Sequence, residues 1–325
     1  MEKTKFIQIF ESVKRNSKNK NRKCMHENCN ENAIKSHVLQ KNGILKEISV
    51  KNHLFQFNNT SSFEIEDKGK FELKRVGIND VYTFPGFCKN HDAKIFSPIE
   101  NQKNINLESD LSICLFSYRT LCQEIRRKEI ALDIANGMLE TNYNIQLILY
   151  LTDFKNGLLN GIKNLNFFKR EFEKLINGKE NNFIFKICEI PKIDICISGP
   201  LNIYDKENPL TETHNENLEV TNNPFTTSVL NIFPYKEKSF VMIAQHKDFE
   251  CNWTNKVFNI FQTGNQNLIL KLISDLVTTR FEFWCISPTL KESIEKEKLT
   301  KLFKFWESEV LNFDFVIKNK FNLFE

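Results

Sequence analysis

The sequence contains no apolar run that approaches the roughly 18 residues of a membrane-spanning helix. Its first residues, Met1-Glu2-Lys3-Thr4-Lys5, lack the apolar segment of a signal peptide. There is no internal repeat, and residues 179–325 contain neither a glycine-rich phosphate loop nor a pair of catalytic carboxylates. We therefore expect a cytoplasmic protein without a membrane partner, whose chemistry lies in its N-terminal part.

The nine cysteines also lack the features of a disulfide framework, because their number is odd and their spacing does not repeat. A chain of 325 residues can bury a sizeable core without such cross-links. Thiols in a protein of this size indicate a reducing compartment, with metal-binding or core roles. Cys114 and Cys122 lie on a predicted helix and are expected to be core thiols.

The net charge of +4 hides an uneven distribution. Residues 1–100 hold 18 Lys and Arg against 12 Asp and Glu, whereas the remainder is slightly acidic. A polyanionic partner, DNA or RNA, is thus expected at the N-terminal part. The basic stretch 14–23, which includes Lys18, Lys20, Arg22 and Lys23, fits either a solvated linker or an arm that contacts phosphates.

Two pairs of potential metal ligands stand out in the N-terminal part. Cys24 and Cys29 flank a short polar loop, and Cys88 and His91 have the spacing of one helical turn. Zinc is commonly held by two such pairs from distant parts of a chain, in tetrahedral geometry. The pattern predicts a structural zinc site. The alternative is that this spacing arises by chance in a chain with nine cysteines.

The hydrophobic periodicity predicts an α+β fold in three parts. Residues 1–100 would form a zinc-binding domain, residues 101–178 a long helical hairpin, and residues 179–325 a mixed α+β domain of unknown role. The predicted helices cover 4–13, 42–48, 92–96, 105–138, 145–176, 268–277 and 291–310. The predicted strands cover 33–39, 54–57, 183–190, 193–197, 228–233, 240–244 and 281–286, with a hairpin over 58–80.

Three local features refine this prediction. Pro98 is expected to end the helix that begins near Cys88, because proline cannot continue a helix interior. Asn177-Gly178 is a turn signal and marks the boundary after the hairpin. Arg126, Arg127 and Lys128 fall on helical turns that we expect to be exposed.

The order Cys-x4-Cys, Ser36-His37 and Cys-x2-His-Asp resembles the treble-clef zinc scaffold and, more narrowly, HNH-type nucleases. It is also similar to a set of bacterial proteins that share these motifs with Gly-Phe-Cys, proteins of a kind often involved in antiphage defence. The resemblance covers about residues 20–100. It implies a structural zinc bound by Cys24, Cys29, Cys88 and His91.

The same resemblance implies that His37 is the general base and that Asp92 binds a catalytic Mg²⁺ or Mn²⁺. Histidine has a pKa suited to proton abstraction near neutral pH, and a carboxylate suits Mg²⁺. The family usually has histidine where this chain has Asp92, and Asn79 or Asn90 matches its middle asparagine only approximately. His37 could equally be a structural histidine.

Two functions follow from these observations. The first is a metal-dependent nuclease that hydrolyses phosphodiester bonds in DNA or RNA. The second is a non-catalytic zinc module that binds nucleic acid or a protein partner. His37 and Asp92 fall at the motif positions of the HNH-type nucleases, which favours the nuclease. The lack of a clear match to the middle asparagine of that motif favours the binding module.

Overall fold

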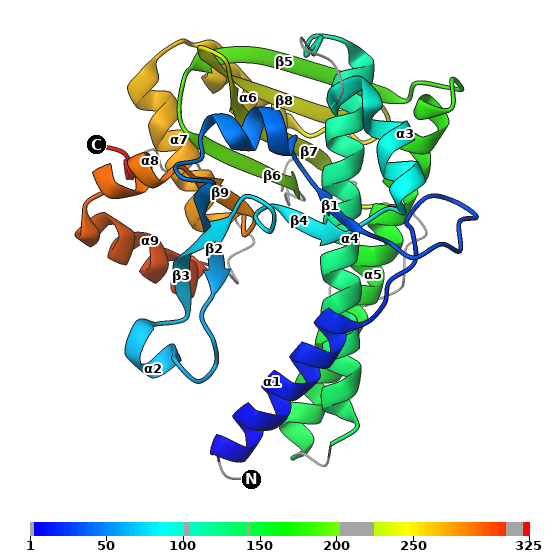
Figure 1. Cartoon of the computed structure of the whole chain (residues 1–325), viewed down its shortest axis with the longest axis vertical. Coiled ribbons are helices and arrows are strands. Elements are labelled where there is room, and N and C mark those ends of the chain that lie inside the picture. The colour runs from blue at the N-terminus through cyan, green and yellow to red at the C-terminus, as the bar shows by residue number, and fades with distance from the viewer. Residues whose placement is uncertain (1–2, 101–104, 142–143, 202–223, 310–320) are drawn as a thin grey trace.

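The computed structural model describes residues 3–100, 105–141, 144–201, 224–309 and 321–325, and its fold is α+β as predicted (Figure 1). The helices are α1 Lys3–Asn19, the π-helix η1 Lys41–Leu45, α2 Ile65–Lys68, α3 Lys89–Glu100, α4 Asp110–Leu139, α5 Ile145–Ile176, α6 Asn252–Gln262, α7 Gln266–Thr279, α8 Pro288–Ser293 and α9 Lys296–Glu309. The strands are β1 Lys35–His37, β2 His53–Asn59, β3 Phe71–Gly77, β4 Thr83–Pro85, β5 Phe183–Pro191, β6 Ile195–Leu201, β7 Ser228–Tyr235, β8 Lys238–His246 and β9 Trp284–Ile286.

Seven strands form one antiparallel sheet in the order β3-β2-β9-β6-β7-β8-β5. Alternate residues of its strands enter two different cores, as the two-residue period of a strand requires. Cys196 and Cys285 face the core formed with α4, α5 and the N-terminal region, whereas Ile197 and Trp284 face the core formed with α6, α7 and α9. The sheet is therefore covered by helices on both faces.

The β2–β3 hairpin joins this sheet through β9, with Phe55 opposite Ile286 and Gln56 opposite Cys285. Strands from residues 53–77 and from residues 183–286 thus share one sheet. The boundaries at residues 100 and 178 stay a prediction. Gly178, with a positive φ of 70°, makes the turn expected after α5.

The helix α4 is the centre of the molecule. Its middle part, from Ser112 to Gln123, is buried on every side, and α5 runs back along it as the predicted hairpin. Cys114 and Cys122 are fully buried there, so their expected role as core thiols is confirmed. Among the described residues, no helix combines the length and apolar character needed to span a bilayer.

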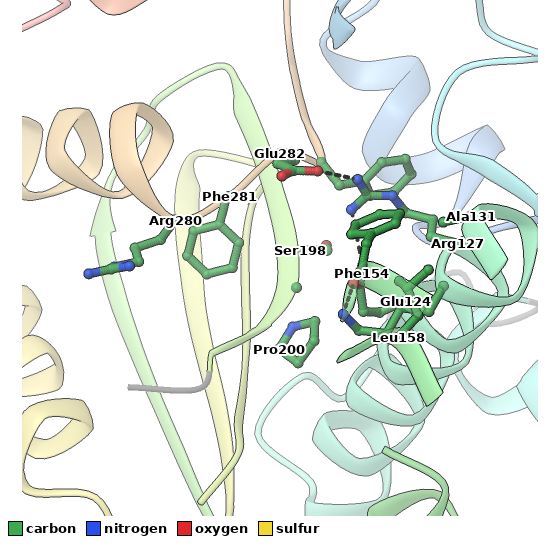
Figure 2. Close-up of a pocket in the computed structure, with 13 residues that line it drawn as sticks. Glu124, Arg127, Ala131, Phe154, Leu158, Ser198, Pro200, Arg280, Phe281 and Glu282 are labelled. Carbon is green, nitrogen blue, oxygen red and sulfur yellow. Dashed lines mark hydrogen bonds and ion pairs between the residues drawn. The ribbon is translucent and has the colours of Figure 1, made fainter. Parts of the chain in front are cut away.

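A small cavity of about 320 Å³ lies where α4 and α5 meet the end of β6 and the segment before β9 (Figure 2). Arg127 bridges this junction. Its guanidinium donates to Glu124 at 3.0 Å on its own helix and to Glu282 at 2.5 Å across the gap. The ion pair between Arg127 and Glu282 therefore ties the helical hairpin to the sheet.

Several local predictions were wrong. Residues 63–68 form a turn and the short helix α2, not a strand of the expected hairpin. The helix α6 was not predicted, and the expected helix over 291–310 is divided between α8 and α9.

Pro98 does not end α3, which continues to Glu100. A proline at position 98 cannot donate a backbone hydrogen bond to the carbonyl of Lys94. The hydroxyl of Ser97 donates to that carbonyl instead, at 3.3 Å. The carbonyl keeps a donor, and the last turn of the helix is retained.

Candidate metal centre

The four predicted ligands converge on one point. The ligand atoms of Cys24, Cys29, Cys88 and His91 all lie within 4.8 Å of one another. Cys24 Sγ is 3.5 Å and Cys88 Sγ 3.3 Å from His91 Nδ1, and the sulfurs of Cys29 and Cys88 are 4.0 Å apart. Tetrahedral zinc, with its usual bond lengths, requires about 3.8 Å between sulfurs and about 3.5 Å between sulfur and nitrogen. The cluster could therefore hold a metal ion such as zinc.

The first pair of ligands is set by a tight loop. The backbone N–H of Cys29 donates to the carbonyl of His26 at 3.2 Å, and Asn28 adopts a positive φ of 58°, which asparagine tolerates. Cys24 N–H donates to Glu31 at the base of the loop. His26 is not among the four ligands. Its ring stacks on that of His91 at 3.9 Å and so supports the ligand from outside.

The second pair of ligands lies where β4 leads into α3. Met25 N–H donates to the carbonyl of Gly86 at 3.0 Å, which joins the loop to this segment. Gly86 is required here because a Cβ atom would lie 2.6 Å from the ring of Phe84. Cys88 and His91 then face the same side at the first turn of α3.

The electrostatics of the thiols differ. Burial raises the pKa of Cys24 to about 11. Burial would also raise the pKa of Cys88, but the backbone N–H of His91, the thiols of Cys24 and Cys29 and the backbone N–H of Asn90 stabilise its thiolate. Its pKa therefore lies below the usual value. Both sulfurs must be thiolates to bind a metal. The site therefore favours the thiolate of Cys88. The thiol of Cys24 would lose its proton only when a cation binds.

The strands β1 and β4 pair as a two-stranded antiparallel sheet beside this cluster, with Ser36 opposite Phe84 and His37 opposite Thr83. Ser36 is buried, and its hydroxyl accepts from the N–H of Phe87 at 3.2 Å. His37 lies on the opposite face of β1 from Ser36 and is half-buried. Its Nε2 donates to the carbonyl of Ile78 at 2.9 Å. This bond leaves Nδ1 as the ring nitrogen that can accept a proton.

The environment of His37 keeps its ring neutral. Burial lowers its pKa below the ordinary value. The hydrogen bond to Ile78 and the carboxylate of Glu100 act in the opposite direction and raise this pKa, whereas the charges of Lys41 and Arg119 lower it further. A neutral imidazole at pH 7 is the form that a general base requires.

Asp92, the second predicted catalytic residue, points toward a cation that the sequence reasoning missed. Arg119 is fully buried, donates to Glu100 at 2.6 Å and lies 3.8 Å from the Asp92 carboxylate. Its guanidinium also stacks at 3.8 Å on the ring of Phe96. The one available signal was a single arginine inside the apolar run 113–122, since a cation in such a run needs a buried partner.

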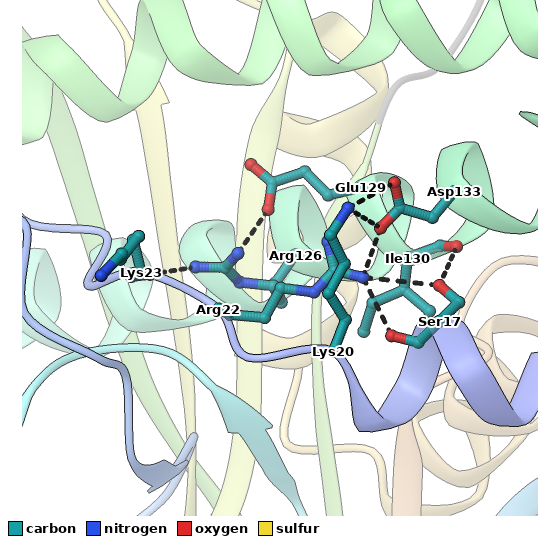
Figure 3. A network of polar contacts seen from close by, with 8 residues as sticks. All are labelled: Ser17, Lys20, Arg22, Lys23, Arg126, Glu129, Ile130 and Asp133. Atoms are coloured by element: carbon teal, nitrogen blue, oxygen red, sulfur yellow. Dashed lines mark hydrogen bonds and ion pairs between the residues drawn. The ribbon is translucent and has the colours of Figure 1, made fainter.

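The basic stretch 14–23 is not a separate linker. The helix α1 continues to Asn19, and the residues that follow are fastened to α4 (Figure 3). Arg22 lies 2.7 Å from the carboxylate of Asp133, and Lys20 lies 3.2 Å from it. Phosphate contacts by this stretch stay a prediction, but two of its four named cations already have an acidic partner.

Arg126 is buried rather than exposed, which corrects the expectation for this turn of α4. Its guanidinium donates to the carbonyl of Lys23 at 2.7 Å and to Glu129 at 2.7 Å. Lys23 directly precedes Cys24, so this contact positions the start of the metal-binding loop on α4.

We expect Asp133→Ala to lower the free energy of unfolding by about 1–3 kcal/mol, because the nearly buried guanidinium of Arg22 would lose its acidic partner. Urea denaturation measures this change. Lys20→Ala is the matched control, since Lys20 is largely exposed and its pair with Asp133 should contribute less than about 1 kcal/mol. Equal losses in the two variants would contradict a special role for Arg22.

Comparison with protein-family models, with curated proteins and with solved structures finds no match for this chain. The assignment to HNH-type nucleases and the link to antiphage defence therefore stay predictions that rest on the motifs.

Proposed function

We propose that Cys24, Cys29, Cys88 and His91 bind one structural zinc ion in a treble-clef-like unit. The observation that carries the proposal is the meeting of four ligand atoms from segments separated by 58 residues. The unit comprises the ligand loop, the paired strands β1 and β4, and α3, in the order that the treble clef has. The long insertion between β1 and β4 supplies the β2–β3 hairpin of the main sheet.

We further propose that this unit is a metal-dependent nuclease of the HNH type. His37 would take a proton from the attacking water through Nδ1, while the bond from Nε2 to Ile78 holds the ring. Asp92 would supply an oxygen ligand to Mg²⁺ or Mn²⁺, which would stabilise charge on the leaving oxygen. The lowered pKa of His37 supports this assignment, and so does the place of Asp92 on the first turn of α3, directly after the ligand His91.

One observation favours the second candidate, a non-catalytic zinc module that binds nucleic acid or a protein. Asp92 already faces the buried cation of Arg119 at 3.8 Å. A divalent ion would have to compete with that charge for the carboxylate, because two cations close to one oxygen repel each other. In this alternative, His37 and Asp92 stabilise the fold.

Cleavage assays with the zinc-loaded full chain distinguish the two candidates. A panel of single- and double-stranded DNA and RNA would be incubated with Mg²⁺ or Mn²⁺ and resolved on gels. The nuclease proposal expects cleavage that requires the added cation and stops when it is chelated. Binding without cleavage would support the second candidate. A protein that neither binds nor cleaves any member of the panel would contradict both functions that involve nucleic acid.

A further inference from the structure

The segment that follows β1 places a lysine beside the proposed general base. Lys41 is the first residue of the π-helix η1, four residues after His37. The turn between β3 and β4 holds both side chains. His37 donates from Nε2 to the carbonyl of Ile78 at 2.9 Å, and the ammonium group of Lys41 donates to Oδ1 of Asn79 at 3.4 Å. The histidine and the lysine are thus bound to consecutive residues of one turn.

The backbone of η1 fixes the position of this lysine. The N–H of Leu45 donates to the carbonyl of Gln40 at 3.0 Å, which is the wide turn of a π-helix. The side-chain amide of Gln40 donates to the carbonyl of Glu100 at 2.7 Å and attaches the start of η1 to the end of α3. Gly43 is required beside it, because a Cβ atom there would overlap Gln40 Oε1. Lys41 therefore extends from a segment that is anchored to α3.

Lys41 is a cation without an acidic partner. It forms no ion pair with any residue that the structure describes, and its hydrogen-bond partner Asn79 is neutral. By contrast, Lys35 on β1 is paired with Asp80 at 2.5 Å. Lys41 is half-buried and Asn79 is exposed, so an anion in solution can reach the ammonium group.

The charge of Lys41 also acts on the ring of His37. Burial is the main cause of the lowered pKa of His37, and the charge of Lys41 lowers this pKa further. A charge has such an effect only when it lies close to the titrating group. The same geometry would bring the ammonium group close to a phosphate that is attacked by water bound at His37.

A phosphate in that position would gain from a nearby cation. Negative charge collects on the non-bridging oxygens of a phosphodiester during hydrolysis, and a cation placed there in advance stabilises the transition state. Lysine binds phosphate as a compact point charge with three donors. The lack of an acidic partner means that Lys41 need not break an ion pair to do so.

We propose that Lys41 is a further catalytic residue, whose ammonium group binds a non-bridging oxygen of the scissile phosphate. The water oxygen forms the new bond to phosphorus, its proton moves to Nδ1 of His37, and the bond from phosphorus to the leaving sugar oxygen breaks. Lys41 forms no covalent bond and stabilises the charge on the phosphate, while Asn79 orients it. This inference rests on the proposed nuclease function.

Single-turnover cleavage by the zinc-loaded full chain tests the inference, with the panel member that the wild type cleaves fastest and with Mg²⁺ or Mn²⁺. Lys41→Gln removes the charge but can still donate to Asn79. Its maximal rate should fall by more than about tenfold, because a stabilising donor at the phosphate is lost. Lys41→Arg keeps a cation and should recover part of that rate.

Lys46→Gln is the matched control. Lys46 follows η1 directly, is exposed and donates to the side chain of Asn52, so the variant removes the same charge and a similar lysine–asparagine bond. Lys46 is not among the charges that act on His37. This variant should cleave at the maximal rate of the wild type. Zinc content and circular dichroism would verify that each variant is folded.

Asn79→Ala tests whether Asn79 orients the lysine. The variant alone should slow cleavage, because the ammonium group loses its bond to the turn. In the Lys41→Gln background it should have little further effect, since residues that act through one another are not additive. Equal effects of Asn79→Ala in both backgrounds would contradict the orienting role.

The wild type alone shows whether the proposed function holds. If it cleaves no member of the panel, the nuclease proposal fails and the assignment of Lys41 fails with it. If it cleaves, and folded Lys41→Gln reaches the same maximal rate or is slowed only as much as Lys46→Gln, the assignment of Lys41 alone is wrong. If Lys41→Gln raises only the substrate concentration at half-maximal rate, Lys41 contacts the nucleic acid away from the scissile phosphate, which also overturns the inference.

Discussion

Replacing Cys88 with serine should reduce the zinc content from about one ion per chain to nearly none. Cys88 has the sulfur that α3 favours as a thiolate, and its Sγ is the ligand atom nearest to His91 Nδ1. Serine keeps the size of the side chain but is not a zinc ligand in such sites. Because metal binding and folding are coupled in zinc sites of this kind, the free energy of unfolding should fall by more than about 3 kcal/mol.

The loss of structure in Cys88→Ser should be confined to the metal-binding unit. The loop of Cys24 and Cys29 joins the rest of the unit by few backbone bonds, among them that from Met25 to Gly86. The β2–β3 hairpin, by contrast, is held in the main sheet by β9. Hydrogen exchange should therefore show loss of protection over residues 22–37 and 83–92, while the strands of the main sheet stay protected.

Two controls identify the ligands. Cys188→Ser changes a half-buried thiol on β5, outside the cluster, and should keep the zinc. His26→Ala removes the ring that stacks on His91 but none of the four ligands, so it should weaken zinc binding without abolishing it. Elemental analysis that finds full zinc in Cys88→Ser, or none in the wild type, would contradict the assignment.

The metal ligands and the long helices could be predicted because their signals are local. Cys88 and His91 are one helical turn apart, and the stripe of apolar residues in 145–176 has the period of the observed helix α5. The runs 183–190 and 228–233 correspond to β5 and β7 for the same reason. Each of these patterns is complete within a short segment, so the sequence alone contains it.

What the sequence could not provide is the pairing of distant segments. The alternation in 54–57 predicts a strand but not its neighbour, and β2 pairs with Ile286, more than 200 residues later. The residues that follow α1 are held on α4 by Asp133, whose carboxylate pairs with both Lys20 and Arg22. The ion pair of the buried Arg119 with Glu100 likewise required the structure.

The largest effect on activity is expected from His37→Gln. A glutamine amide can still donate to the carbonyl of Ile78, so the variant should keep the local fold and the zinc, but it cannot accept the proton that Nδ1 would take. A positioned general base typically contributes on the order of 10²–10⁴ in rate. Cleavage of the preferred substrate with Mg²⁺ or Mn²⁺ should fall by that factor, and His53→Gln, outside the proposed site, should not change it.

The pH profile provides a readout that a purely structural role would not give. Because burial lowers the pKa of His37, its base form should persist below pH 6.5, and the rate should begin to fall only at lower pH. His37→Gln should remove this acidic limb from whatever slow cleavage remains. If His37→Gln cleaves as fast as the wild type, or if it loses zinc, His37 belongs to the structure, and the Asp92–Arg119 pair then indicates a binding module.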